Sequence, residues 1–326
     1  PFVPASIKEF DSRAQEILNI QSTGLARRMI SAHTEKLIIG LSGGLDSTLA
    51  FLVCLETLKS QAVEQKNLIA VTLPGPGTSE HTLQSVHELT ESVDLKVREI
   101  KIHTAVEQHL RDIEHSGNTD TVFENAQARE RTQVLFDLAN QEAGIVVGTG
   151  DLSELALGWC TFNADQMSNY NVNVSVPKTM IIYLVEWYAK HKASKNLALA
   201  LKRVIDTPIS PELIPPQQGE IQQKTEEVIG PYELHDFFIY HFLRNGSSPT
   251  KIFHLANLAY KEKYSQKEIQ KWLKLFFERF FSQQFKRTTL PPGPKIGSVS
   301  LSPRGDWRMP DEASATIYTK EIEALI

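Results

Sequence analysis

The chain has 326 residues, of which 41% are hydrophobic and 22% charged, a composition typical of a globular protein with a sizeable core. Its formal net charge is −5, which argues against a nucleic-acid scaffold because such proteins usually carry a basic excess. No apolar run approaches the ~18 residues that a membrane span needs, so we expect neither a nucleic-acid nor a membrane partner. The two cysteines, Cys54 and Cys160, lie far apart, and this pattern favours a reducing cytoplasm over a disulfide framework.

Strand-like and helix-like segments alternate along the first half of the chain. Apolar residues at helical spacing predict an N-terminal helix within residues 1–35. Short apolar or alternating runs predict strands at 37–40, 68–73, 95–102 and 145–147. Helical spacing follows each of the first three, starting at Asp46 and then over 79–92, 104–114 and 121–141. This alternation predicts an α/β fold, doubly wound, with a mainly parallel sheet.

Helices predominate after residue 175. The predicted helices cover 180–191, 194–204, 232–244, 249–261 and 265–284. Between them, residues 206–231 are rich in Pro, Gln, Gly and Glu and have no period, so we predict a loop or a lid. We therefore divide the chain into an α/β part with its N-terminal helix (1–205), this loop (206–231) and a helical C-terminal part of the same domain (232–326), the last forty residues being mostly irregular.

The stretch IIGLSGGLDSTLAF, residues 38–51, leaves a buried strand through glycines and hydroxyls and then begins a helix. Gly43 and Gly44 lack a side chain, so the backbone N–H groups at the helix N-terminus can approach an anion closely. Ser42 and Ser47 can add hydroxyl donors. Asp46 would repel a bare phosphate, and its presence makes sense if Mg²⁺ lies between the carboxylate and the phosphates.

Two common phosphate-binding motifs do not match this stretch. A Walker A loop requires a lysine after the glycines, and this chain has none there. The dinucleotide-binding G-x-G-x-x-G spacing is also missing. An ordinary turn without a ligand remains the structural alternative. The pattern Ser-Gly-Gly-x-Asp-Ser resembles the PP-loop of ATP pyrophosphatases, whose adenine-nucleotide α-hydrolase-like fold cleaves ATP between its α- and β-phosphates.

Two later stretches, VVGTGDLSELALGW (146–159) and NYNVNVSVPKT (169–179), resemble the NAD synthetase family, specifically the synthetase half of its long, glutamine-dependent form. The resemblance extends from NIQSTGLARR (19–28) to SPRGDWRMP (302–310). It implies ATP-dependent amidation of deamido-NAD to NAD through an acyl-adenylate, with AMP and pyrophosphate as the other products. ATP is then a cosubstrate and Mg²⁺ a cofactor.

The resemblance also assigns roles to individual residues. Asp46 and Lys178 would be catalytic, and Asp46 and Glu154 would bind Mg²⁺. The residues assigned to ATP are Gly40, Ser42, Gly43, Gly44, Asp46, Ser47, Thr149, Lys178 and Ser210. Those assigned to deamido-NAD are Arg129, Asp165, Asn169 and Lys286. Short forms of the family have a substrate lysine where this chain has Phe162 and an aspartate where it has Asn169, and Asp165 is a nearby carboxylate that could replace that aspartate.

Long forms carry a glutaminase half with a Cys, Glu and Lys system, which we do not find in these 326 residues. The chain begins where that N-terminal glutaminase domain would end, so we expect ammonia-dependent activity from this chain alone and glutamine-dependent activity when it is joined to that domain. The family resemblance also implies a homodimer. The alternatives are another PP-loop adenylating amidotransferase and a non-catalytic nucleotide-binding domain. Asp46, Glu154 and Lys178 together favour an enzyme, because binding alone would not need them.

Overall fold

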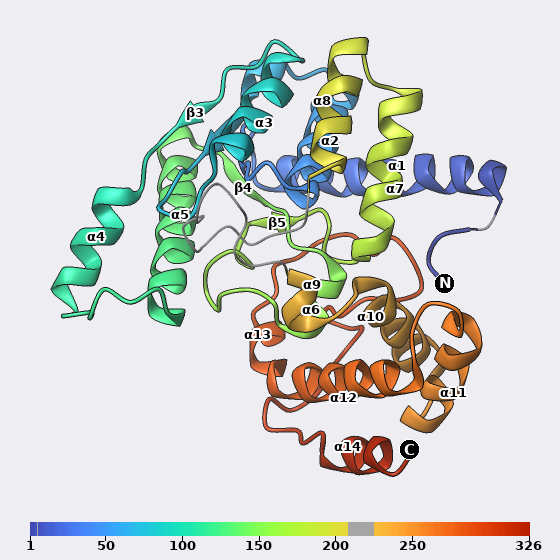
Figure 1. Ribbon diagram of the computed structural model, residues 1–326. Coiled ribbons are helices and arrows are strands. Elements are labelled where there is room, and N and C mark those ends of the chain that lie inside the picture. Colours follow the sequence, from blue (N-terminus) through green and yellow to red (C-terminus); the bar gives the residue numbers. More distant parts are fainter. Residues whose placement is uncertain (5, 208–224) are drawn as a thin grey trace.

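The computed structural model describes residues 1–4, 6–207 and 225–326 (Figure 1). Ser210 and most of the segment predicted as a loop or lid lie outside these residues. Among the described helices, none combines the length and apolar character that crossing a membrane would require.

A parallel sheet forms the centre of the α/β part. Its strands are β1 (Leu37–Gly40), β2 (Leu68–Thr72), β3 (Arg98–Glu99), β4 (Ile145–Gly148) and β5 (Tyr170–Asn171). In the described part of the chain they are ordered β3-β2-β1-β4-β5, and every neighbouring pair is parallel. The central strands are almost continuously apolar because both of their faces are buried.

Helices cover both faces of this sheet, as the doubly wound prediction requires. Leu37 and Ile39 of β1 pack into one apolar cluster and Ile38 into another, because successive side chains of a strand point to opposite faces. The first cluster draws on α1 (Ile7–Ser31), α2 (Leu45–Ser60), α3 (Glu80–Glu91), α7 (Lys178–His191) and α8 (Lys195–Ile205). The second draws on α4 (His103–Asp112) and α5 (Thr121–Glu142). The predicted α/β fold is confirmed.

The C-terminal helices form a separate layer below the sheet in the view of Figure 1. They are α9 (Thr225–Ile229), α10 (Tyr232–Ile239) with a π-helical turn (Tyr240–Arg244), α11 (Pro249–Tyr260), α12 (Gln266–Ser282), α13 (Gln284–Thr288) and α14 (Thr316–Glu323). Their core is aromatic, with Phe276, Phe277 and Phe280 fully buried. The short helix α6 (Leu152–Leu157), which follows β4, packs into the same core and so connects the sheet to this layer.

Several elements differ from the sequence-based expectations. Strand β3 covers only Arg98–Glu99 of the predicted 95–102, and the short helices α6 and α13 were not predicted. Strand β5 was not predicted, since two residues are too few to show a period and they become a strand only by pairing with β4. Helix α9 lies within the interval predicted as a loop. Helix α14 lies in the C-terminal stretch predicted as mostly irregular, and it is stabilised by packing against α12.

The turn between β1 and α2 requires glycine at one position in particular. Gly43 has φ of +75°, in the left-handed region, and a Cβ there would lie 2.9 Å from the carbonyl oxygen of Thr82. Gly44 has ordinary backbone angles, and among the described residues a Cβ there would meet only the Ser42 hydroxyl, at 3.4 Å. Packing within the chain therefore explains Gly43 but not Gly44.

This difference predicts unequal effects of alanine at the two positions. We expect Gly43→Ala to lower the free energy of unfolding by at least about 1–2 kcal/mol, because an L-residue is strained at positive φ. Gly44→Ala should cost less than about 1 kcal/mol, the scale of a helix-capping preference. Urea unfolding followed by circular dichroism measures both, and equal losses would contradict this account of the turn.

Candidate active site

The site lies where the order of the strands changes direction. β1 and β4 are neighbours, but the chain continues from β1 to β2 on the opposite side. In open parallel sheets, ligands bind in the crevice outside the carboxyl ends of the strands at such a point. Here the loop 41–44 follows β1 and leads into α2, whose first turn carries Asp46, and the loop 149–151 follows β4.

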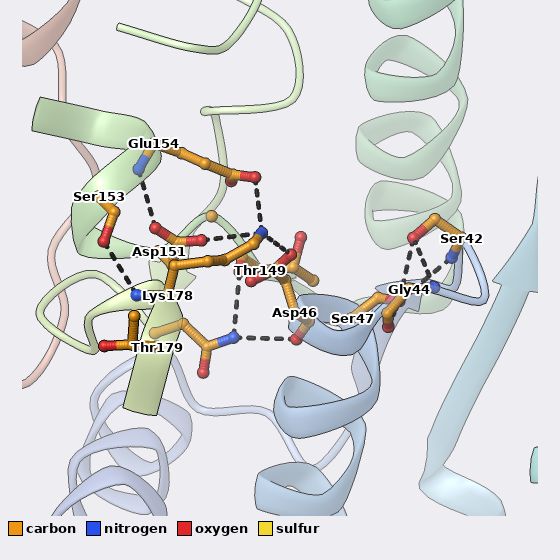
Figure 2. A network of polar contacts seen from close by, with 12 residues as sticks. Ser42, Gly44, Asp46, Ser47, Thr149, Asp151, Ser153, Glu154, Lys178 and Thr179 are labelled. Atoms are coloured by element: carbon orange, nitrogen blue, oxygen red, sulfur yellow. Dashed lines mark hydrogen bonds and ion pairs between the residues drawn. The ribbon is translucent and has the colours of Figure 1, made fainter. Parts of the chain in front are cut away.

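Lys178 lies at the centre of three carboxylates (Figure 2). Its Nζ is 2.5 Å from Oδ2 of Asp46, 2.8 Å from Oε1 of Glu154 and 3.0 Å from Oδ2 of Asp151. The Lys178 side chain is only 3% exposed. Lys178 begins α7, and a positive charge is unfavourable at a helix N-terminus because the helix dipole is positive there. The three ion pairs offset this unfavourable interaction. The structure thus brings together the three predicted residues Asp46, Glu154 and Lys178.

Asp151 is a site residue that the sequence-based reasoning missed. Its Oδ1 accepts a hydrogen bond from the backbone N–H of Glu154 at 2.8 Å and so caps the N-terminus of α6. An Asp three residues before a Glu, ahead of an apolar run, is an ordinary capping pattern. That pattern accounts for the hydrogen bond to Oδ1 of Asp151, but it does not indicate that Oδ2 forms an ion pair with Lys178.

Burial and mutual repulsion raise the pKa values of Glu154 and Asp151. Burial raises the pKa of Glu154 to about 7, with a contribution from the Asp46 carboxylate, while Lys178 opposes the rise. Burial also raises the pKa of Asp151 well above its usual value, reinforced by Glu154. Burial alone would lower the pKa of Lys178, but the three carboxylates outweigh it and hold that pKa well above its usual value.

The donor set fits a divalent cation. One carboxylate oxygen from each of Asp46, Asp151 and Glu154 can be chosen so that all lie within 4.8 Å of one another. When all are ionised, the three acids and Lys178 carry two net negative charges. Oδ1 of Asp46 is buried and accepts no hydrogen bond from the residues that the structure describes. Carboxylate oxygens are the ligands that Mg²⁺ prefers, so the residues present could hold that ion.

Hydrogen bonds fix the two loops that border the cluster. The hydroxyls of Ser42 and Ser47 lie 3.1 Å apart, and Ser47 also donates to the carbonyl of Gly44. The side-chain amide of Asn173 donates to the carbonyls of Asp46, at 2.9 Å, and Thr149, at 3.0 Å. Asn173 therefore joins the loop after β1 to the loop after β4. It is a second site residue absent from the sequence-based assignments, although it lies in one of the stretches that carry the family resemblance.

The predicted substrate residues have varied surroundings. Arg129 is exposed on α5. Oδ1 of Asn169 accepts from the backbone N–H of Val146, and Oδ1 of Asp165 accepts from that of Thr161. The ammonium group of Lys286 donates to the carbonyls of Gly158 and Cys160, at 2.8 and 2.7 Å. Their roles in binding substrate remain predictions.

The ion pairs predict a strong effect of removing the ammonium group. Lys178→Met would leave three close carboxylates uncompensated, and loss of one partner from a buried ion pair typically costs about 3–5 kcal/mol. We expect a loss of that order in the free energy of unfolding, partly recovered on addition of Mg²⁺. Lys192→Met is the matched control: its partially exposed pair with Glu56 should contribute about 1 kcal/mol or less. Equal losses in urea unfolding would contradict this account.

Comparisons with known proteins identify the family of this chain. The family model described as NAD synthase matches residues 17–287. A curated relative, the glutamine-dependent NAD(+) synthetase of Mycobacterium leprae, is 41% identical over 348 aligned positions, which cover 99% of this chain and 51% of the relative. The chain thus spans about half the length of the curated relatives that it matches.

Solved structures show the same fold. A glutamine-dependent NAD(+) synthetase from Cytophaga hutchinsonii superposes with a TM-score of 0.75 at 18% identity, covering 96% of this chain and 56% of that one. A second, from Acinetobacter baumannii in complex with ADP, superposes with a TM-score of 0.55 at 21% identity, covering 92% and 49%. The extent of the family match and the 41% identity over nearly the whole chain show that this protein belongs to the NAD synthase family.

Proposed function

We propose that this chain amidates deamido-NAD to NAD, using ATP and ammonia and releasing AMP and pyrophosphate. The observation that carries the proposal is the buried cluster of Asp46, Asp151, Glu154 and Lys178 beside a glycine-containing loop at a helix N-terminus. A cluster of this charge suits a metal-bound polyphosphate better than an uncharged ligand. Family membership supplies the class of product, NAD.

The loop after β1 supports the placement of the ATP phosphates there. The backbone N–H groups at the start of α2 are donors of the kind that bind anions. The hydroxyls of Ser42 and Ser47, which contact each other and the Gly44 carbonyl in this structure, would become donors to a phosphate by rotating away from these contacts. Gly44 is unexplained by packing within the chain, and close approach of a phosphate is a reason for glycine at that position. The Acinetobacter baumannii relative was solved in complex with ADP.

The chemistry requires activation of a carboxylate. An oxygen of the nicotinate carboxylate attacks the α-phosphorus of ATP, and the bond from that phosphorus to the pyrophosphate breaks. Ammonia then attacks the carbonyl carbon of the acyl-adenylate, the bond to AMP breaks, and the extra proton leaves the nitrogen. Mg²⁺ held by Asp46, Glu154 and the newly found Asp151 would neutralise phosphate charge. Lys178 would stabilise the charge that develops on the departing pyrophosphate, and the loops would hold the reactants in place.

The cysteines of this chain support ammonia, rather than glutamine, as its direct nitrogen source. Cys54 is fully buried. Sγ of Cys160 donates to the side-chain oxygen of Gln166 at 3.1 Å, and burial raises the pKa of its thiol. Since the thiolate is the nucleophilic form, neither residue is suited to attack glutamine. We propose that the other half of the long relatives supplies the glutaminase and that the enzyme is a cytoplasmic homodimer.

A direct assay tests the reaction. We expect the chain with ATP, Mg²⁺, deamido-NAD and ammonium chloride to release one pyrophosphate for each NAD formed. Glutamine in place of ammonium should give no NAD. Nicotinic acid mononucleotide serves as a second acceptor to test the substrate class. Pyrophosphate release without NAD would favour another adenylating enzyme, and NAD formation from glutamine alone would refute the assignment of the nitrogen source.

Asp46→Asn tests the role of the first carboxylate. We expect turnover to fall at least ~100-fold, the scale of losing one electrostatic contact in the transition state, while the circular dichroism spectrum stays that of the folded protein. Glu56→Gln is the matched control, because it makes the same charge change on the same helix at the contacts with Tyr188 and Lys192. Unchanged turnover in Asp46→Asn would remove this residue from the mechanism.

A further inference from the structure

A buried carboxylate on α10 contacts the two elements that carry the cluster. Asp236 is 1% exposed. Its Oδ2 accepts hydrogen bonds from the backbone N–H of Thr179 at 2.9 Å and from the hydroxyl of Thr179 at 2.6 Å. Its Oδ1 accepts a short hydrogen bond from the hydroxyl of Ser153. Thr179 follows Lys178 on α7, and Ser153 lies between Asp151 and Glu154 on α6.

These contacts replace a cap that α7 does not have. The residue at its N-cap position is Pro177, which makes no side-chain hydrogen bond to the first turn. The first N–H groups of a helix need partners from elsewhere. Ser153 Oγ accepts from the backbone N–H of Lys178 at 2.9 Å, and Asp236 accepts from that of Thr179 (Figure 2 shows Ser153 and Thr179 beside Lys178). The start of α7 is therefore capped by a residue of α6 and a residue of α10.

The same face of α10 also contacts the ammonium end of Lys178. Tyr232 lies one helical turn before Asp236, so the two side chains share a face. The Lys178 Nζ lies 5.3 Å from the centroid of the Tyr232 ring, a cation–π distance. Ser153 thus holds the backbone of Lys178, and Asp236 holds the neighbouring Thr179 and Ser153 itself. The carboxylates and the Tyr232 ring hold the charged end of Lys178.

We propose that Asp236 is a positioning residue of the synthetase reaction, which sets the place of Lys178 relative to Asp151 and Glu154 through Ser153 and Thr179. This inference rests on the proposed function for its effect on turnover. It makes the C-terminal helical layer a part of the active site, although that layer supplies no carboxylate to the cluster. Asp236 acts on the reacting groups only through Lys178 and α6.

A role in stability alone explains the residue less well. Burying a carboxylate is costly, and a well-packed apolar residue is often at least as stabilising. Burial does raise the pKa of Asp236, and the hydrogen bonds from Ser153 and Thr179 oppose that rise. Among the described residues, Asp236 accepts three hydrogen bonds, two from Thr179 in the first turn of α7 and one from Ser153 in α6. This is the arrangement expected of a group that sets the spacing between the start of α7 and the helix that carries Glu154.

The test compares variants that keep or remove individual contacts. Asp236→Asn keeps the size but removes the charge and one acceptor. Thr179→Val removes the hydroxyl at nearly constant shape, and Thr179→Ser keeps it. Ile252→Ala is the control: Ile252 is fully buried in the C-terminal core, so its truncation should destabilise that layer without touching the network.

We expect Asp236→Asn to lower kcat at least tenfold while KM for ATP changes less than twofold. Thr179→Val should lower kcat in the same way, and Thr179→Ser should stay within threefold of wild type. The double variant Asp236→Asn, Thr179→Val should lose no more than Asp236→Asn alone. Ile252→Ala should lower Tm at least as much as Asp236→Asn and leave kcat unchanged. Equal kcat in Asp236→Asn and Ile252→Ala at matched folded fraction would overturn the proposal.

Amide hydrogen exchange provides a readout that does not depend on activity. Asp236→Asn should speed exchange at the Lys178 and Thr179 amides at least tenfold, and Ile252→Ala should not. If wild type makes no NAD but exchange responds in this way, the proposed function fails and the positioning contact stands. If wild type is active and neither kcat nor exchange responds to Asp236→Asn, the positioning role fails alone.

Discussion

The ion pairs of Lys178 with Asp46, Asp151 and Glu154 are the interaction on which the arrangement of the site depends. The four residues lie in the first turn, or at the N-cap, of three different helices, α2, α6 and α7. Bringing their charges out of water is unfavourable unless each finds its partners with good geometry. The surrounding fold meets that condition by placing β1 beside β4 and by tying the two following loops together through Asn173.

Helix α6 illustrates how much of the site depends on its neighbours. It spans only Leu152–Leu157, and so short a helix is not stable in water by itself. Its N-terminal half is fixed by the Asp151 cap and by Ser153. Its C-terminal carbonyls accept hydrogen bonds from cationic side chains of α12 and α13, namely Arg279, Lys286 and Arg287. Cations are favourable at that end of a helix, so the C-terminal layer holds the helix that presents two of the acids.

The periodicity of the sequence was sufficient to predict the parallel α/β fold. The loop pattern indicated Asp46, and the family resemblance indicated Glu154 and Lys178, so three of the four charged residues in the cluster were predicted. Continuous apolar runs reveal strands buried on both faces, and the Ser-Gly-Gly-x-Asp-Ser pattern marks the loop that follows the first of them. Asp151 and Asn173 were not predicted as site residues, because their local sequence patterns are those of an ordinary helix cap and an ordinary polar turn. Their second roles are contacts with Lys178, Asp46 and Thr149, which no local pattern encodes.

By itself, the sequence determined the class of fold, because periodicity is a local property, and its turn chemistry predicted a phosphate-type loop with Asp46. The predicted roles of Glu154 and Lys178 came from the family resemblance. Only the tertiary structure decided that Lys178 faces three carboxylates rather than two and that Asp236 caps the start of α7. It also decided that Gly43 is required by its backbone angle and by Thr82. Each of these depends on which distant groups share one buried volume, and that is settled by how the sheet and the C-terminal helices pack.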